Sequence, residues 1–212
     1  MIAPLNINTL NTFNPKTLID YTDNTPLKVG IDVDGVLVNY AESILTTAKM
    51  LDIYTPQPKR IEHWELYPHI FEDKASWHKA HTALMETASD MPPLDPFAPG
   101  AIATMRAAGI HVYIVTARTG DLIVEQMHSF CENNHIEVDG IITSSEKHTV
   151  DIDILYEDNP YTLAECLHSK VLPVRKPWDY NLSQTHLDAL PIEIPSAANT
   201  AELAAWVIAG VL

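Results

Sequence analysis

The stretch KVGIDVDGVLVNY, residues 28–40, constrains the fold more than any other part of the chain. Residues 28–33 have the apolar composition of a buried strand. Yet Asp32 and Asp34 stand at its end, just before Gly35. Burying one carboxylate is costly, and a second one close by adds repulsion. A strand that ends in this way requires something that lowers that cost.

Strand-like and helical segments alternate after residue 99. The last helix is expected to begin near Asn199, with Glu202 placed like the partner in a capping box. This β-α-β-α rhythm predicts an α/β fold, a Rossmann-like doubly wound parallel sheet with helices on both faces. The expected strands are 28–33, 111–116, 140–143, 153–157 and 170–174, and the expected helices are 41–53, 100–109, 121–134 and 160–169.

The chain divides into three parts by composition. Residues 1–27 are rich in Asn, Thr and Pro and are read as an N-terminal arm. Residues 28–40 and 97–212 carry the alternating pattern and are read as the core domain. Residues 41–96 hold many prolines and the helical stretch DKASWHKAHTALMETA, and we read them as a small helical cap inserted into the core.

The cap is rich in aromatic and cationic side chains that have two interpretations. They can form a small core of the cap itself, which is the commoner outcome for such residues. Alternatively, one or two of the rings stack on a nucleobase. The histidines lack a metal-binding spacing, and the two cations fit a solvated turn as well as a phosphate contact. The residues concerned are Trp64, Tyr67, Phe71, Trp77, His63, His78, Lys59 and Arg60.

Polar side chains follow the predicted strands at the points where they end. In a doubly wound sheet, ligands bind at the carboxyl ends of the strands. Taken singly, each of these residues has an ordinary explanation as a cap, a turn former or a solvated group. Together at one sheet edge they indicate a shared site. They are Asp32, Asp34, Thr116, Arg118, Lys147, Glu157 and Asp158.

A divalent cation explains the paired aspartates. Mg²⁺ prefers oxygen ligands in an octahedron and usually keeps some waters. Carboxylates of Asp32 and Asp158 could supply such ligands. Gly35 lets the backbone turn sharply, so that Asp34 can present its carbonyl to the metal and aim its side chain elsewhere.

At this point a resemblance becomes specific. DVDGVLVNY resembles the first motif of the haloacid dehalogenase-like phosphohydrolases, IVTAR the second, and Lys147 with YEDNP the third and fourth. Lys147 precedes Glu157 by ten positions, as in the 5′(3′)-deoxyribonucleotidase-like branch of that superfamily. The resemblance covers roughly residues 28–178, and the insertion 41–96 takes the place of a first-type (C1) cap. The four motifs together are a strong signal, whereas any one is weak.

The resemblance implies a catalytic pair. Asp32 would be the nucleophile that forms an aspartyl-phosphate. Asp34 would protonate the leaving oxygen and then activate water. Dehalogenases of the superfamily lack this second aspartate, so Asp34 favours phosphate chemistry.

The resemblance also implies a phosphate site and a Mg²⁺ cofactor. Thr116, the backbone near Ala117, and Arg118 would hold phosphate oxygens, and Lys147 would balance charge on Asp32 and on the phosphoryl group. The implied metal ligands are Asp32, Asp34, Asp158 and Glu157, the last either directly or through a water. One departure is the Glu-Asp of the fourth motif, where many deoxynucleotidases have Asp-Asp.

The net charge of −15 and the pI near 4.9 bear on partners and location. An acidic chain is poorly suited to a nucleic acid duplex or an anionic membrane. Cys131 and Cys166 fit reduced, buried thiols better than a disulfide scaffold. The start of the chain lacks a signal-peptide pattern, so we expect a cytoplasmic protein of a cell or an infected host. The sequence leaves a homodimer open.

The expected function is a Mg²⁺-dependent phosphatase acting on a nucleoside monophosphate or deoxymonophosphate, a 5′-nucleotidase of the haloacid dehalogenase-like type. One alternative is the same chemistry, or a phosphomutase reaction, on a sugar phosphate or another small ester. Another alternative, of a different class, is a catalytically idle binding or scaffold protein that kept the fold. The presence of both Asp32 and Asp34 argues against idleness.

Overall fold

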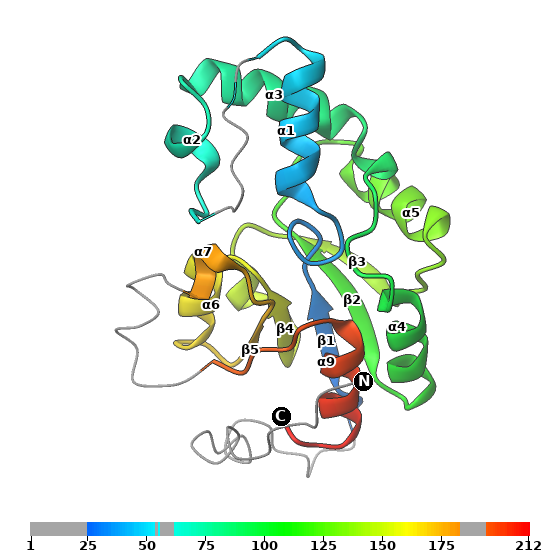
Figure 1. Ribbon diagram of the computed structural model, residues 1–212. Coiled ribbons are helices and arrows are strands. Elements are labelled where there is room, and N and C mark those ends of the chain that lie inside the picture. The colour runs from blue at the N-terminus through cyan, green and yellow to red at the C-terminus, as the bar shows by residue number, and fades with distance from the viewer. Residues whose placement is uncertain (1–24, 54, 56–61, 183–193) are drawn as a thin grey trace, which may run out of the picture.

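One five-stranded parallel sheet, in the order β3-β2-β1-β4-β5, forms the centre of the molecule (Figure 1). The computed structural model describes residues 25–53, 55, 62–182 and 194–212. The strands are β1 (Lys28–Ile31), β2 (His111–Thr116), β3 (Gly140–Thr143), β4 (Ile154–Glu157) and β5 (Leu172–Arg175). Because β1 lies between β2 and β4, the ends of these three strands are neighbours. The predicted α/β sheet is confirmed.

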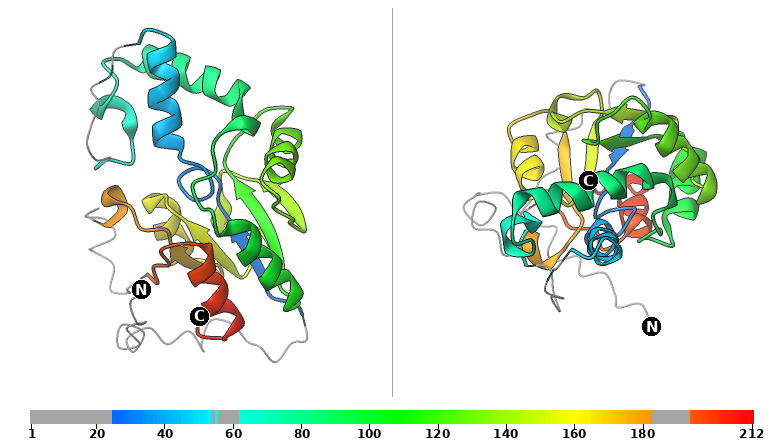
Figure 2. Two further views of the ribbon diagram at one scale, coloured as in Figure 1. Left: turned by 45° about the vertical axis from the view of Figure 1, so that its right-hand side comes forward. Right: turned by 90° about the horizontal axis from the view of Figure 1, so that it is seen from above.

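Helices cover both faces of the sheet (Figures 1 and 2). Ile31 and Ile114 belong to the core on the first face, whereas Val115 and Leu155 belong to the core on the second. This is the alternation expected of strands that are buried on both sides. The first face carries α4 (Ala98–Ala107), α5 (Ile123–Asn133) and α9 (Thr200–Ile208), and the second carries α6 (Pro160–Cys166).

The segment predicted to be a cap lies beyond the carboxyl ends of the strands (Figures 1 and 2). Its helices are α1 (Tyr40–Met50), α2 (Leu66–His69), α3 (Lys74–Glu86) and the 3₁₀ turn η3 (Ala88–Asp90). α1 packs against α3, and the Tyr40 hydroxyl lies 2.8 Å from His81 Nδ1 across that contact. The division into core and cap stays a prediction. Most of the N-terminal arm, together with Lys59 and Arg60, lies outside the described residues.

A tight loop joins β1 to α1 at the position that the DVDG sequence occupies. β1 ends at Ile31, two residues earlier than predicted, because the Val33 carbonyl accepts hydrogen bonds from the N–H groups of Leu37 and Val38, both at 2.9 Å. Gly35 has φ +78°, a conformation that favours glycine. Because the strand ends at Ile31, the backbone of Asp32 and Asp34 belongs to the loop.

The chain after β5 contains a helix that the sequence pattern did not predict. This helix, α7 (Asp179–Leu182), lies beside the carboxyl end of the sheet (Figure 1). Trp178 and Asn181 anchor it to the core. The Trp178 indole N–H donates to the Gly35 carbonyl at 2.7 Å, and the Asn181 amide donates to the Asp158 carbonyl at 2.8 Å.

The last helix begins where the sequence placed it. Asn199 caps α9, because its side chain accepts a hydrogen bond from the Glu202 N–H at 3.0 Å. Glu202 reaches back to the N–H of Ala198 rather than to that of Asn199, at 2.7 Å, so the reciprocal half of the capping box is displaced by one residue. Within the part of the chain that the structure describes, no helix has the length and apolar character needed to span a bilayer.

Candidate active site

Asp32, Lys147 and Glu157 form a buried charge cluster at the carboxyl ends of β1 and β4. Lys147 Nζ lies 2.6 Å from Asp32 Oδ1 and 2.7 Å from Glu157 Oε2. This lysine belongs to the 3₁₀ turn η4 (Lys147–Thr149), which precedes β4. All three side chains are at least 95% buried. These three residues therefore lie together at one edge of the sheet, as the sequence predicts.

Asp158 completes an acidic group with Asp32 and Glu157. One carboxylate oxygen from each lies within 4.8 Å of the others. Asp158 Oδ2 accepts a short hydrogen bond from the Tyr180 hydroxyl, whereas Oδ1 is buried and has no protein partner. A Cβ on residue 35 would overlap the Asp158 carboxylate, so Gly35 is required here for space as well as for its backbone conformation. The glycine of the DVDG sequence therefore makes room for an acid 123 positions later.

The electrostatics of the cluster set its members apart. Burial and the neighbouring Glu157 raise the pKa of Asp32, against the lowering effect of Lys147. Burial, Glu157 and Asp32 likewise raise the pKa of Asp158. Burial alone would raise the pKa of Glu157, but Lys147 and the N–H of Asn159 outweigh it and lower that pKa. Lys147 thus favours the ionised form of Glu157. The positive charge near Asp32 and Asp158 is too small to offset the effect of burial and of their acidic neighbours.

The donor set fits a divalent cation. When all three carboxylates are ionised, they exceed the one ammonium by two negative charges, and Asp158 Oδ1 is an oxygen ligand without a partner. All the candidate ligand atoms are carboxylate oxygens, which suit Mg²⁺. Both oxygens of Glu157 are already engaged, by Lys147 and by the N–H groups of Asp158 and Asn159. Asp32 and Asp158 are therefore the better candidates for direct ligation.

Asp34 lies outside this acidic group and faces Arg118 instead. The guanidinium donates to Asp34 Oδ2 at 2.9 Å and to Oδ1 at 2.6 Å, in a bidentate pair. Arg118 is 7% exposed, and its remaining nitrogen Nη1 is buried without a partner. An arginine with this geometry can bind a carboxylate or a phosphate in the same bidentate way. In this structure the predicted phosphate-binding residue holds the predicted general acid.

Thr116 and Ala117 end β2 beside these groups. Thr116 is 1% exposed, and its Oγ1 accepts a hydrogen bond from the Arg118 N–H at 3.2 Å. Ala117 is exposed. The hydroxyl thus helps to set the turn that aims Arg118 back toward the end of β1.

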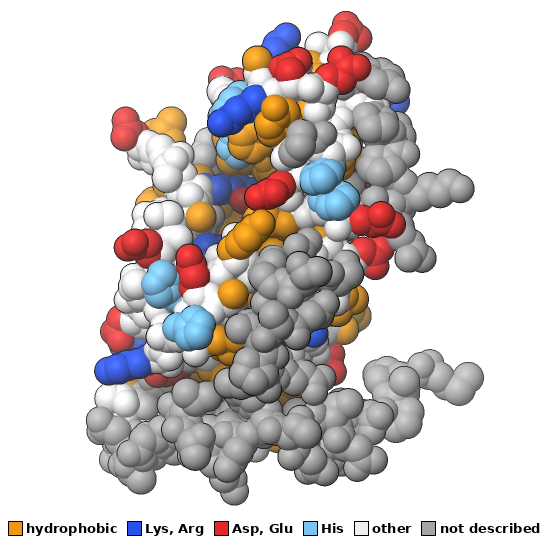
Figure 3. All heavy atoms as spheres, turned by 90° about the vertical axis from the view of Figure 1, so that its left-hand side faces the viewer, with side chains coloured by type: hydrophobic (Ala, Val, Ile, Leu, Met, Phe, Trp, Pro, Cys, Tyr) orange, Lys and Arg blue, Asp and Glu red, His pale blue; other side chains and the backbone are white. Residues whose placement is uncertain are grey.

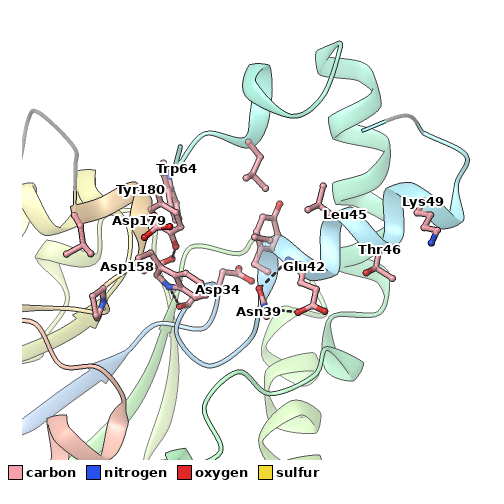
Figure 4. Close-up of a pocket in the computed structure, with 17 residues that line it drawn as sticks. Asp34, Asn39, Glu42, Leu45, Thr46, Lys49, Trp64, Asp158, Asp179 and Tyr180 are labelled. Carbon is pink, nitrogen blue, oxygen red and sulfur yellow. Dashed lines mark hydrogen bonds between the residues drawn. The ribbon is translucent and has the colours of Figure 1, made fainter. Parts of the chain in front are cut away.

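A pocket of about 860 Å³ lies between the cap and the core and reaches the acidic group at Asp158 (Figure 4). Asp34, Gly35 and Asp158 line its floor. α1 forms one wall, and Trp64 with Tyr180 stands on the other (Figure 4). On the face where α2 and α7 lie, hydrophobic side chains are interspersed with acidic, basic and histidine side chains (Figure 3).

The cap aromatics lie in two kinds of surroundings, and stacking of any of them on a nucleobase stays a prediction. Phe71 is 1% exposed and belongs to the core, and Tyr67 and Trp77 pack against that core. Trp64 instead lines the pocket. His63 and His78 are exposed.

Comparisons with known proteins bear on the fold. No family model matches the chain, and no curated protein matches it in sequence. Solved structures do match. A haloacid dehalogenase-like hydrolase from Burkholderia xenovorans LB400 has TM-score 0.60 and 10% identity, covering 88% of this chain and 99% of that one. A predicted phosphatase from Clostridium acetobutylicum has TM-score 0.58 and 14% identity, covering 87% and 99%. The D,D-heptose 1,7-bisphosphate phosphatase of B. bronchiseptica, complexed with magnesium and phosphate, has TM-score 0.51 and 13% identity, covering 87% and 99%.

The chain has a haloacid dehalogenase-like fold. The resemblance that four short motifs suggested is thereby confirmed for the architecture. Identities of 10 to 14% show the fold and leave the substrate open.

Sequence reasoning missed one part of the site within this haloacid dehalogenase-like fold. Trp178, Tyr180 and Asn181 contact the loop of Gly35 and the acid Asp158 from a helix that follows β5. The signal was present, since the aromatic stretch KPWDYN follows the end of a predicted strand. Its position at the carboxyl end of a parallel strand could have indicated a role at the site.

Proposed function

We propose that the protein is a Mg²⁺-dependent phosphatase that hydrolyses a nucleoside monophosphate or deoxymonophosphate through an aspartyl-phosphate. The observation that carries the proposal is the buried group of Asp32, Asp158 and Glu157. Lys147 binds Asp32 and Glu157, and Asp158 lines the floor of a pocket. A nucleophilic carboxylate, a fixed ammonium and an oxygen-ligand set are the parts that phosphoryl transfer requires.

In the first step, an Asp32 oxygen forms a bond to phosphorus as the bond from phosphorus to the ester oxygen breaks. A proton from Asp34 passes to that oxygen, so the leaving group departs as an alcohol. In the second step, Asp34 takes a proton from a water whose oxygen attacks phosphorus. The acyl-phosphate bond breaks, inorganic phosphate departs, and the carboxylate of Asp32 is restored.

A magnesium ion held by Asp32 and Asp158 would neutralise charge on the phosphoryl oxygens. Lys147 keeps Asp32 Oδ1 in place, and Glu157 keeps Lys147 charged. The heptose bisphosphate phosphatase, whose structure contains magnesium and phosphate, supports this assignment by its shared fold.

The pair between Arg118 and Asp34 has a consequence for the cycle. A bidentate arginine holds Asp34 as an acceptor only. The phosphate of the substrate offers Arg118 a second anion, and its unpartnered Nη1 supplies a further donor. Substrate binding would therefore release Asp34 for proton transfer.

The test is a phosphate-release screen across nucleoside monophosphates, sugar phosphates and 3′-phosphorylated oligonucleotides, with Mg²⁺ or EDTA. We expect the highest kcat/KM on nucleoside monophosphates, loss of activity in EDTA, and recovery with Mg²⁺. Asp32→Asn is expected to lose on the order of 10³-fold or more in kcat, as removal of a nucleophile does. Asp151→Asn, a matched change at an exposed carboxylate, serves as the control.

The outcomes separate the alternatives. A best rate on sugar phosphates would replace the nucleotide assignment. Turnover by Asp32→Asn near the wild-type rate would remove the nucleophile assignment. Mg²⁺ binding without hydrolysis of any ester would favour a binding protein that kept the fold.

A further inference from the structure

The Tyr180 hydroxyl donates a hydrogen bond to Asp158, one of the candidate metal ligands (Figure 4). We propose that this bond restricts Asp158 to a single ligand oxygen and so makes the site prefer Mg²⁺ to Ca²⁺, a proposal that rests on the metal site of the proposed function. Ca²⁺ takes roughly six to eight oxygens and readily accepts both oxygens of one carboxylate, whereas Mg²⁺ needs an octahedron and keeps several waters. The number of oxygens that the protein can supply therefore decides between the two ions.

The two oxygens of Asp158 have different surroundings. Oδ2 accepts the hydrogen bond from Tyr180, and a Cβ on Gly35 would overlap the same oxygen, so the glycine backbone also lies close to it. An ionised carboxylate oxygen has about two lone-pair sites. The hydroxyl takes one of them, and the glycine leaves little room at the other. Oδ1 is buried and has no partner among the described residues, so it is the oxygen that remains for a metal ion.

Tyr180 is fixed in place by its neighbours. Its ring centroid lies 5.7 Å from that of Trp64 and 6.0 Å from that of Trp178, whose ring is tilted from it by 11°. The Trp178 indole is itself tied to the loop after β1, since its N–H lies 2.7 Å from a carbonyl there. Asn181 is fully buried and donates to the Asp158 carbonyl at 2.8 Å. Moving the hydroxyl away from Oδ2 to admit a larger ion would disturb these contacts.

The other two acids of the cluster supply few additional oxygens. Lys147 Nζ lies 2.6 Å from Asp32 Oδ1 and 2.7 Å from Glu157 Oε2. Glu157 Oε1 accepts hydrogen bonds from the N–H groups of Asp158 and Asn159, each at 3.0 Å. One oxygen of Asp32 and one of Asp158 are thus left for direct ligation.

A site with so few protein oxygens suits the smaller ion. Mg²⁺ is commonly bound by one or two carboxylates together with waters and substrate phosphate. Ca²⁺ needs more ligands than these single oxygens provide, and it gains most from a carboxylate that offers both. Loss of the Tyr180 hydroxyl would free Asp158 Oδ2 and remove the restriction.

The experiment compares the affinities of the two ions. Mg²⁺ and Ca²⁺ are titrated separately into the intact, metal-free protein, followed by calorimetry and by the increase in Tm. We expect the wild-type protein to bind Mg²⁺ more tightly than Ca²⁺. In Tyr180→Phe the ratio of Mg²⁺ affinity to Ca²⁺ affinity should fall by at least about tenfold, the scale of a lost partner of a metal ligand. Tyr156→Phe, which removes a buried hydroxyl that donates to the Ala197 carbonyl, should keep the wild-type ratio.

Infrared difference spectra measure the ligation mode directly. The antisymmetric and symmetric stretches of a carboxylate lie closer together when both of its oxygens bind one ion. We expect the spectrum of single-oxygen ligation in the wild-type protein with either ion, and a two-oxygen spectrum in Tyr180→Phe with Ca²⁺. The wild-type spectrum with Ca²⁺ tests the proposal even if Tyr180→Phe does not fold.

Different results overturn this proposal and the proposed function. Wild-type affinity for Ca²⁺ equal to that for Mg²⁺, a two-oxygen spectrum in the wild-type protein, or an unchanged ratio in Tyr180→Phe overturns the role of Tyr180 and leaves the phosphatase chemistry intact. A preference for Mg²⁺ that is lost in Tyr180→Phe, in a protein that releases phosphate from no ester, overturns the proposed function and leaves the metal selection intact. Binding of neither ion overturns both.

Discussion

The buried cluster at the strand ends and the pocket wall above it are both acidic, but they are built in opposite ways. In the cluster, Asp32 and Glu157 share one buried lysine, and Asp158 is fully buried beside them. On the wall, Glu42 and Asp179 are exposed to solvent. Carboxylates in the two regions therefore experience very different solvation.

Because of this difference in solvation, function is tied to stability in the cluster and separable from it on the wall. Removing one partner of a buried ion pair leaves an uncompensated charge, so the cluster cannot be altered without a cost to the fold. Exposed groups are solvated in either case and can change with little effect on folding. We expect chemistry to be constrained in the cluster and selectivity to be adjustable on the wall.

The largest difference in the free energy of unfolding should come from replacing a lysine by methionine in each region. Lys147→Met leaves Asp32 and Glu157 buried without their cation, and we expect it to lower the free energy of unfolding by about 3–5 kcal/mol. Lys49→Met, on the exposed wall, should stay within about 1 kcal/mol. Urea denaturation of both variants measures the contrast. Similar losses in the two variants would contradict the idea that burial separates the cluster from the wall.

A second contrast isolates the contact between Gly35 and Asp158. Gly35→Ala should lower the free energy of unfolding by about 2 kcal/mol or more, from backbone strain and from overlap with the carboxylate. Gly109→Ala has a similar φ of +83° but nothing within 4 Å of the added Cβ, so it reports the strain alone. Chemical denaturation gives the difference between the two. Equal losses would show that Asp158 moves aside freely.

The third prediction concerns the residue that connects the regions. Tyr180→Phe keeps the ring on the wall but removes the hydroxyl that holds Asp158. We expect Mg²⁺ to bind about tenfold more weakly, as when a partner of a metal ligand is lost. Tyr156→Phe also removes a buried hydroxyl, one that donates to the Ala197 carbonyl, and serves as the control. Calorimetric titration with Mg²⁺ decides, and unchanged affinity in Tyr180→Phe would remove its positioning role.

The smallest predicted effect is a pH dependence of metal binding. The raised pKa values of Asp32 and Asp158 mean that these groups retain protons at pH values where ordinary carboxyls are ionised. Protons then compete with Mg²⁺, and affinity rises as the pH rises. The increase in Tm caused by Mg²⁺ should therefore grow as the pH rises above the range in which ordinary carboxyls ionise. If the increase in Tm were the same at every pH, protons would not compete with Mg²⁺ for Asp32 and Asp158.

Much of the core followed from local pattern. The strand 111–116 and the start of the last helix after Asn199 were predicted where they occur, because alternation and capping are local signals. Strand β1 was predicted too long, since the hydrogen bonds that end it come from Leu37 and Val38 within the next loop. Helix α7 was missed because its four residues are too short for a helical period.

Composition and strand order alone predict that acidic groups meet at one edge of a parallel sheet, because strand ends are readable from composition and parallel strands share an edge. The family resemblance adds that Lys147 balances charge on Asp32. The other pairings come from the three-dimensional structure, which also joins Lys147 to Glu157, gives Arg118 to Asp34, and places Tyr180 against Asp158. These choices depend on distances of a few ångströms between segments far apart in the chain, and no local pattern encodes such distances.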